Sequence, residues 1–288
     1  MDSILRTLLV FVVLTASGFA ADDFAATKKK AEAGDAIAQY ELGWMYQFSV
    51  GAPEDSAEAV KWYRLAADQG HRVAQVTLGL MYHNGSGVPK DYAEAMKWHR
   101  LAAAQGDTSS QIAVGVMYGN GDGVPKDSPE AVKWYRLAAD QGSVRAQSYL
   151  GWMYNNGDGV PKDHAEAVKW WRKAADQGDA EAQLRLGLMY DTGRGVPKNY
   201  SEAARWFRKA ADQGNADAQL ALGDMYRLGV GVPKDLVLAH VWLNIAAAAN
   251  LGIAKENLAV VEDQMTDTQK EKAMDLAREL FAKLPKKK

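Results

Sequence analysis

The chain has 288 residues, of which 48% are hydrophobic and 24% charged, an ordinary composition for a soluble protein of one or two domains. Its formal net charge of −2 argues against nucleic acid or anionic lipid as partners, because these attract proteins with a basic excess. It contains no cysteine, which excludes disulfide frameworks, thiolate catalysis, cysteine-ligated zinc and a lipid-modified N-terminal cysteine.

Residues 1–20 have the pattern of a secretory signal peptide. Arg6 provides the basic start, residues 8–14 (LLVFVVL) form the apolar core, and 18–20 (GFA) form a small-x-small cleavage site. We expect cleavage after Ala20 and export to the bacterial envelope, either periplasmic or secreted. An uncleaved membrane anchor is the alternative, although the apolar run is far shorter than the ~20 residues that span a bilayer. No later segment is apolar enough to span, so we expect no stable membrane insertion after cleavage.

From residue 35 onward the sequence repeats with a period of 36 residues and without insertions. Gly43, Met45 and Trp62, for example, recur in register in six copies. A fixed period of this length is typical of stacked repeat proteins, in which each copy contacts its neighbours. The copies are 35–70, 71–106, 107–142, 143–178, 179–214 and 215–250; they lie between an N-terminal capping segment, 21–34, and C-terminal capping helices with a basic tail, 251–288.

Each copy is predicted to form helix, loop, helix. In the first copy the first helix covers about 36–47, with Leu42 and Tyr46 on one apolar stripe and Gly43 small enough for close helix approach. The second helix begins after an Asp or Asn N-cap with glutamate three residues later, such as Asp91 and Glu94, which predicts a capping box. It ends at a glycine suited to the left-handed conformation, namely Gly70, Gly106, Gly142, Gly178 and Gly214.

The tryptophan of each second helix is predicted to be a core residue. Ala59, Trp62 and Ala66 fall at i, i+3 and i+7 on one helical face. We expect each indole to pack between the first helix of its own copy and the next helix pair. Burial of such a ring stabilises by a few kcal/mol, on the order of 2 to 3.

The recurring pattern A-Q-x-x-L-G-x-M-Y, then G-x-G-V-P-K-D, then E-A-x-K-W-x-R-x-A-A-x-Q-G resembles the Sel1-like repeat, a relative of the tetratricopeptide repeat with a longer loop. The resemblance covers about residues 31–250. It implies an all-α fold, a right-handed α-solenoid of six 36-residue helix-loop-helix repeats with terminal capping helices. It also implies a role in protein interaction and no particular reaction.

The pattern weakens toward the C-terminus, where Asn250 replaces the closing glycine. Residues 266–284 are predicted to form a last helix that begins with a capping box of Thr266 and Gln269. We expect its apolar residues to face inward, and these are Met274, Leu276, Leu280 and Phe281. The tail 285–288 is expected to be solvated, with contact to anionic surfaces as the alternative.

Within this constant framework, three positions of the first helix vary from copy to copy. Their spacing of four and then three residues places them on one helical face, and the resemblance to tetratricopeptide arrays implies that this face lines a concave groove. These residues are Tyr40, Trp44, Gln47, Val76, Leu80, His83, Ile112, Val116, Gly119, Ser148, Trp152, Asn155, Leu184, Leu188, Asp191, Leu220, Asp224 and Arg227. An apolar stripe with a polar rim is typical of a partner-binding surface. The alternative is that the first two positions of each trio belong to the core.

No motif predicts a catalytic, metal or cofactor site. The recurring GDGVPK resembles a phosphate-binding loop but lacks a preceding strand, and 156–159 (NGDG) resembles a calcium loop without its twelfth-position glutamate. No acyl-transfer signature is present. The histidines have no i, i+4 pairing for zinc, and we expect each at the surface or in the groove: His71, His83, His99, His164 and His240.

A row of basic residues follows the second helices, beginning with Lys61 and Arg64. Such a row could bind acidic polymers. We favour a solvated face on which Glu58 pairs with Lys61 at i, i+3.

The sequence therefore predicts an exported, non-enzymatic interaction module or scaffold that binds a protein or peptide along its concave groove, with no cofactor and no nucleic acid. The alternatives are an envelope enzyme or enzyme inhibitor that acts on cell-wall or polysaccharide material, and a purely structural scaffold for an export complex.

Overall fold

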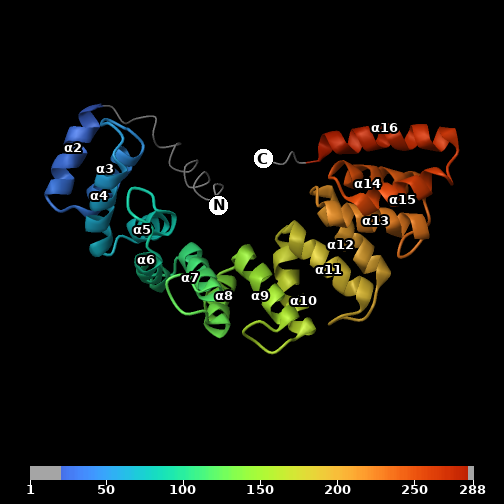
Figure 1. Cartoon of the computed structure of the whole chain (residues 1–288), viewed down its shortest axis with the longest axis horizontal. Coiled ribbons are helices and arrows are strands. Elements are labelled where there is room, and N and C mark those ends of the chain that lie inside the picture. The colour runs from blue at the N-terminus through green and yellow to red at the C-terminus, as the bar shows by residue number, and fades with distance from the viewer. Residues whose placement is uncertain (1–20, 285–288) are drawn as a thin grey trace. The chain divides into compact units, whose positions relative to one another are not determined.

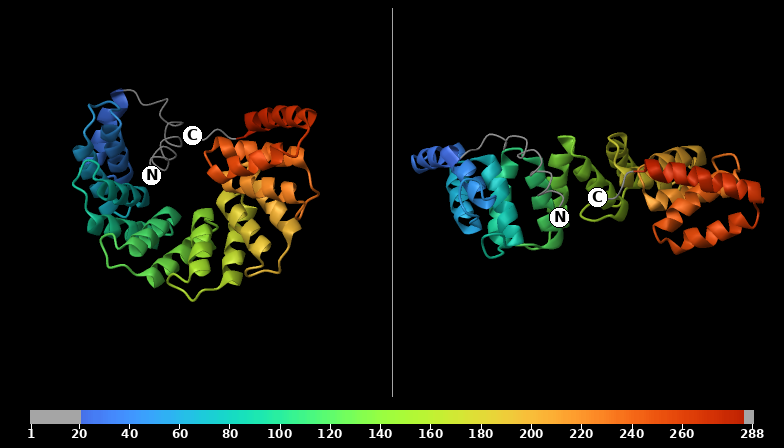
Figure 2. Two further views of the ribbon diagram at one scale, coloured as in Figure 1. Left: turned by 45° about the vertical axis from the view of Figure 1, so that its right-hand side comes forward. Right: turned by 90° about the horizontal axis from the view of Figure 1, so that it is seen from above.

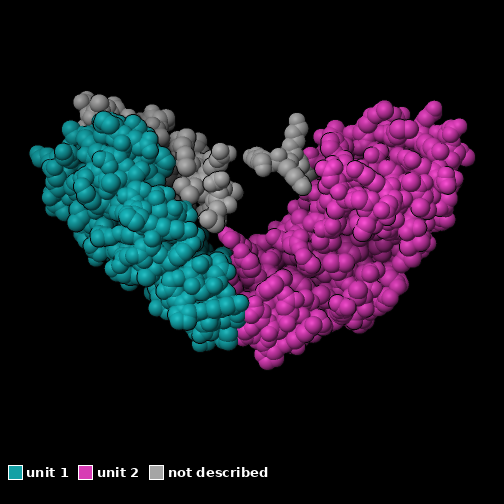
Figure 3. Space-filling view, viewed as in Figure 1, with its two compact units in different colours: residues 1–134 teal, residues 135–288 magenta. Residues whose placement is uncertain are grey.

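The computed structural model describes residues 21–284; the predicted signal peptide (1–20) and the basic tail (285–288) lie outside the described residues. Within the described part the chain forms fifteen helices, α2 to α16, and no strand, so the predicted all-α fold class is confirmed (Figures 1 and 2). The chain divides into two compact units, residues 1–134 and 135–288 (Figure 3). No helix within 21–284 has both the length and the apolar character that crossing a membrane requires.

Helices α3 to α14 form six pairs, in which an odd-numbered first helix is followed by an even-numbered second helix. The helices of unit 1 are α2 (Ala21–Glu32), α3 (Ala36–Gln47), α4 (Ser56–Asp68), α5 (Arg72–Asn84), α6 (Tyr92–Ala104) and α7 (Thr108–Asn120). The boundary between the units falls inside α8 (Ser128–Asp140). The helices of unit 2 are α9 (Val144–Asn156), α10 (His164–Asp176), α11 (Ala180–Thr192), α12 (Tyr200–Asp212), α13 (Ala216–Leu228), α14 (Leu236–Ala248), α15 (Gly252–Glu262) and α16 (Asp267–Lys283).

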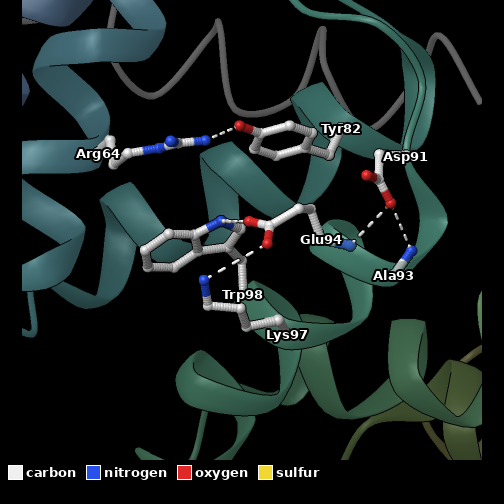
Figure 4. Close-up of polar contacts among 7 residues, drawn as sticks. All are labelled: Arg64, Tyr82, Asp91, Ala93, Glu94, Lys97 and Trp98. Carbon is white, nitrogen blue, oxygen red and sulfur yellow. Dashed lines mark hydrogen bonds and ion pairs between the residues drawn. The ribbon is translucent and has the colours of Figure 1, made fainter.

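Helix ends follow the predicted capping residues. Helix α3 covers Ala36–Gln47 as expected, and the C′ glycines of the second helices, such as Gly70 with φ +86°, adopt the left-handed conformation. Asp91 caps α6, because its carboxylate accepts hydrogen bonds from the N–H groups of Ala93 and Glu94 at 2.9 and 3.0 Å (Figure 4).

The predicted capping box of the second helices is only half formed in α6. The Asp91 side chain accepts from the backbone of Glu94, but the return bond from the Asp91 backbone to the Glu94 side chain is absent. The backbone N–H of Asp91 already donates to the carbonyl of Tyr82 at 2.9 Å, so it has no need of the Glu94 side chain. Glu94 instead accepts from the indole Nε1 of Trp98 at 3.1 Å and lies 3.5 Å from Lys97 Nζ (Figure 4). The glutamate therefore stabilises the middle of the helix.

Glycine in each first helix sets how closely the two helices of a pair approach. A Cβ on Gly43 would lie 2.8 Å from Cδ1 of Tyr63 on α4, which is closer than packed atoms allow. Gly187 meets the ring of Phe207 in the same way. The recurring glycine is thus required by helix packing, as the sequence suggests.

The tryptophans of the second helices are core residues, as predicted, but they face the other neighbour. Trp98 and Trp242 are 2% and 1% exposed. Trp206 packs with residues of α10 and α11, which are the second helix of the preceding repeat and the first helix of its own. The expected contact with the next helix pair is therefore wrong, since each indole closes the interface with the repeat before it.

A buried glutamine in each first helix joins successive repeats. Gln183 is 4% exposed and donates to the carbonyl of Ala175, at the end of α10, at 3.1 Å. Its own carbonyl accepts from the side chain of Gln213, at the end of α12, at 2.8 Å. The amide thereby satisfies a helix-terminal carbonyl that would otherwise lack a partner. Gln39, Gln75, Gln147 and Gln219 make the corresponding bond to the preceding helix.

Helices α15 and α16 both pack on α14 and close the C-terminal end of unit 2 (Figure 2). Thr266 and Gln269 form the predicted capping box at the start of α16. Ala273 and Ala277 are buried, with Leu276 and Leu280 packed against the same core. Two predicted inward residues are wrong: Met274 and Phe281 are 41% and 58% exposed, because the small alanines let the helix lie close on the other side.

Candidate binding surface on the first helices

One outward stripe runs along the first helix of every repeat. Its members are spaced at i, i+4, i+7 and i+11, and we call them the A-helix stripe. In unit 1 they are Ile37, Glu41, Trp44 and Phe48; Val73, Thr77, Leu80 and Asn84; and Ser109, Ala113, Val116 and Asn120. In unit 2 they are Arg145, Tyr149, Trp152 and Asn156; Glu181, Arg185, Leu188 and Thr192; and Asp217, Ala221, Asp224 and Leu228. Helix α15 continues the register with Ile253, Asn257, Val260 and Gln264.

The stripe holds large apolar side chains that the core does not use. Ile37 is 62% exposed, Trp152 49% and Leu228 59%. The other faces of each first helix are occupied by its second helix and by the neighbouring repeats. A row of exposed apolar side chains bounded by polar ones is a feature of interaction surfaces.

The middle residue of each predicted trio lies on this stripe. Trp152 and Leu188 are exposed, whereas Trp44, Leu80, Val116 and Asp224 are half-buried. Trp44 packs against Phe48 with ring centroids 5.3 Å apart. This position therefore presents side chains of different size in successive repeats.

The first residue of each trio faces the neighbouring repeat. Ile112 and Leu184 are 8% and 4% exposed, so the structure places them in the core and they leave the candidate surface. Tyr40 stacks on the His71 ring at 4.9 Å, and burial raises the pKa of its phenol. Ser148 donates to Asp179 at 3.3 Å. Val76 and Leu220 are half-buried at the same position.

The third residue of each trio lies at the edge of the surface and is largely held by its own repeat. Gln47 accepts a hydrogen bond from the Tyr63 hydroxyl at 2.6 Å, and Asn155 lies 3.1 Å from His164 Nδ1. Burial raises the pKa of the Tyr63 phenol, so the hydroxyl remains a donor. His83 contacts the Tyr92 ring edge-on, and Arg227 pairs with Asp224 at 3.0 Å. Asp191 has no ion pair within the described residues.

The sequence reasoning missed the first two stripe positions. Ile37, Val73, Ser109, Arg145, Glu181 and Asp217 share one register, and Glu41, Thr77, Ala113, Tyr149, Arg185 and Ala221 share the next. Both registers vary among the repeats as much as the predicted trio does. They lie seven and three residues before the trio's middle position, so a search for variable positions over the whole helix would have found them.

The two units differ in the charge of their stripes. In unit 1 the only charged member is Glu41. In unit 2 Arg185 pairs with Glu181 at 2.6 Å, and Arg145 bonds the hydroxyl of Tyr149 at 3.1 Å. The stripe of unit 1 thus carries a single charge among apolar and uncharged polar side chains, whereas that of unit 2 combines apolar side chains with several charged ones.

Two histidines expected at the surface or in the groove are buried. His99 is 2% exposed, packs against Gly79, and lies 3.4 Å from Ser110 Oγ. Desolvation lowers its pKa to about 4, with His83 as a smaller cause, so the ring is neutral at pH 7. His240 is also 2% exposed, with Nε2 3.1 Å from Glu262. Both occupy positions of the repeat at which the other copies have apolar or aromatic residues. These positions face the core, so the histidines are buried there as well.

No candidate metal site emerges from these side chains. Among residues 21–284, no three His, Asp or Glu side chains lie close enough together to hold a metal ion. His71 instead accepts the Ala74 N–H as the N-cap of α5.

The basic row of the second helices is engaged within the array. Arg64 donates to the hydroxyl of Tyr82 in the next repeat (Figure 4), and Arg100 and Arg172 make the same bond to Tyr118 and Tyr190. Lys61, Lys133, Lys169 and Arg205 pair with the glutamate three residues earlier. The favoured interpretation of a solvated, locally paired face agrees with these contacts.

Six helix-loop-helix units joined by recurring contacts define an all-α repeat protein. The family model of the Sel1 repeat matches six times, at residues 36–71, 72–107, 108–143, 144–179, 180–215 and 216–251. The chain therefore belongs to the Sel1 repeat family. Proteins of this family are generally interaction scaffolds and generally not enzymes.

Two solved structures are similar to the chain over most of its length. One is c5321, described as a protective antigen present in uropathogenic Escherichia coli strains displaying an SLR fold, with 40% identity and a TM-score of 0.80. The similarity covers 90% of this chain and 55% of c5321, so the chain spans about half of that protein. The other is a Sel1 repeat protein from Oxalobacter formigenes, with 36% identity, a TM-score of 0.66, and coverage of 74% and 87%. No curated protein matches the chain.

Proposed function

We propose that the chain is a non-enzymatic interaction module that binds a protein or peptide along its A-helix stripes. The observation that carries the proposal is the exposure of large apolar residues on one face of the first helices, above all Trp152 at 49%. A half-exposed indole in a helix gives little to folding but can be covered by a partner, and tryptophan is enriched among residues that dominate binding energy.

The test compares Trp152→Ala with Leu137→Ala in the chain from residue 21 onward. Leu137 is also 49% exposed but lies on a second helix, so it controls for the loss of an exposed apolar side chain. Both proteins are used to capture partners from an envelope extract of the source cells. We expect Trp152→Ala to lose about 2 kcal/mol of binding, with capture by Leu137→Ala unchanged. Equal capture by both variants and the unmodified chain would refute the proposal.

We also propose that the chain is exported, which rests on the sequence of residues 1–20. Expression of the full chain and of a variant without 1–20, followed by cell fractionation, tests this directly. The full chain should be recovered outside the cytoplasm with Ala21 as its first residue. Cytoplasmic recovery of both forms would refute export.

A further inference from the structure

We propose that the stripe of unit 2 binds a polypeptide segment in which lysine or arginine alternates with large apolar side chains. This inference rests on the proposed function and names the chemical class of the partner at that surface. It is carried by two features of unit 2, an apolar row and a set of unpaired carboxylates beside it.

The apolar row consists of one residue from each of three first helices or their equivalent. Trp152 on α9, Leu188 on α11 and Val260 on α15 occupy the same register and are 49%, 36% and 47% exposed. Side-chain bonds join α9 to α11 and α15 to α13, the first helix between α11 and α15, whose residue in this register is Asp224. Ser148 of α9 reaches the N-cap of α11, and Asn257 of α15 donates to both oxygens of Asp224 on α13 at 2.9 and 3.0 Å.

Most of the charged side chains that make no ion pair around this row are negative; Lys255 on α15 and Arg194 just after α11 are basic exceptions. No basic side chain of the described residues lies within 4 Å of four carboxylates on these helices or at their ends, which are those of Asp191, Asp217, Glu256 and Asp263. The two basic residues of the stripe, Arg145 and Arg185, and Arg227 beside it are engaged instead. Arg185 and Arg227 each have an ion pair, and Arg145 lies over the Tyr149 ring and bonds its hydroxyl.

A partner that covers the apolar row must therefore offer positive charge at its edges. Desolvating the four carboxylates without counter-charges would oppose binding, and an acidic segment would be repelled. The exposed face of Trp152 also accepts an ammonium or guanidinium group through its π-electrons. Neutral and acidic partners lack this complementarity, and so do polyanions.

The experiment uses three synthetic peptides of equal length with the same leucine and tryptophan positions, whose polar positions are all Lys, all Gln or all Glu. Binding to the chain from residue 21 onward is measured by fluorescence anisotropy at low and at high salt. We expect the Lys peptide to bind about tenfold more tightly than the Gln peptide at low salt, with the difference shrinking at high salt and the Glu peptide weakest.

The charge variant is the double substitution Asp191→Asn and Glu256→Gln, and its matched control is Asp176→Asn. Asp176 is exposed at the end of α10, a second helix. The double variant should bind the Lys peptide about three- to tenfold more weakly than the unmodified chain does, and should bind the Gln peptide with unchanged affinity. The control variant should bind both peptides with unchanged affinity.

Trp152→Ala separates failure of this inference from failure of the proposed function. If all three peptides bind with the same affinity and Trp152→Ala weakens the binding of each, the preference for a basic partner is refuted, and the proposal that the stripe binds a peptide is retained. If Trp152→Ala weakens none of them, both proposals are overturned. Dimerisation of the chain that Trp152→Ala abolishes would make a second copy the occupant and would also overturn the inference.

Discussion

Burial of the neutral His99 ring should make the protein less stable as the pH falls, and replacing His99 by phenylalanine should remove this part of the acid sensitivity. The ring is 2% exposed on α6, and its register is filled by Tyr63, Trp171 and Phe207 in other repeats. An aromatic ring of similar size therefore fits against Gly79, where Phe207 packs against Gly187.

The magnitude follows from the two protonation equilibria. Burial lowers the pKa of His99 to about 4 from its ordinary value of 6.5. The neutral ring favours the folded state above the unfolded-state pKa, and this contribution is lost as pH falls from about 6.5 to about 4, because the unfolded chain takes up the proton first. At about 1.4 kcal/mol per pKa unit, the loss is roughly 3 kcal/mol.

The assay is urea unfolding of the unmodified chain and of His99→Phe at pH 7.5 and pH 4.5, followed by circular dichroism. Carboxylates titrate in the same range, so the quantity of interest is the difference between the two proteins at each pH. We expect His99→Phe to gain about 2 to 3 kcal/mol over the unmodified chain on going to pH 4.5. Parallel pH profiles for the two proteins would refute a neutral, desolvated His99.

Three further predictions test packing at defined positions. Gly43→Ala should lower the free energy of unfolding by about 1 to 3 kcal/mol, because its Cβ would lie 2.8 Å from a ring carbon of Tyr63. Gly119→Ala has nothing within 4 Å of the added Cβ and should raise the free energy of unfolding by about 0.5 to 1 kcal/mol. Thermal or urea unfolding measures both. Ala249→Gln should stabilise by about 0.5 to 1.5 kcal/mol, since position 249 stands 30 residues after Gln219, the spacing at which other repeats pair two glutamines; an unchanged unfolding midpoint would contradict it. Phe281→Ser should change stability by less than about 0.5 kcal/mol, because the ring is 58% exposed, and a larger loss would show that it belongs to the core.

Local signals predicted the repeat framework well because each acts over a few residues. Asp91, Gly70 and Thr266 fix helix ends through their own backbone or side chain, and their effect does not depend on the rest of the fold. Gly43 was also identified as a close-approach residue. Repetition strengthens these signals, since the Asp or Asn N-cap of the second helix recurs in all six copies and the closing glycine in five.

The wrong predictions concern residues whose burial depends on which neighbouring helix covers them. The hydrophobicity of Met274 and Phe281 suggested burial, but the alanines of α16 form its contact face. The variability of Ile112 and Leu184 suggested a surface, yet a position that contacts the next repeat varies with that repeat's own side chains. Helical periodicity places residues on one face but does not determine which neighbour covers it.

The bonds of Gln183 to the ends of α10 and α12 have a consequence for how such a chain changes length in evolution. Every junction between repeats uses the same glutamine and the same helix-terminal carbonyl, as Gln75 and Gln147 show. In-frame duplication or deletion of one 36-residue unit would therefore recreate a junction that already exists elsewhere in the chain. Recombination within the gene can therefore lengthen or shorten the protein without the need for a new kind of interface.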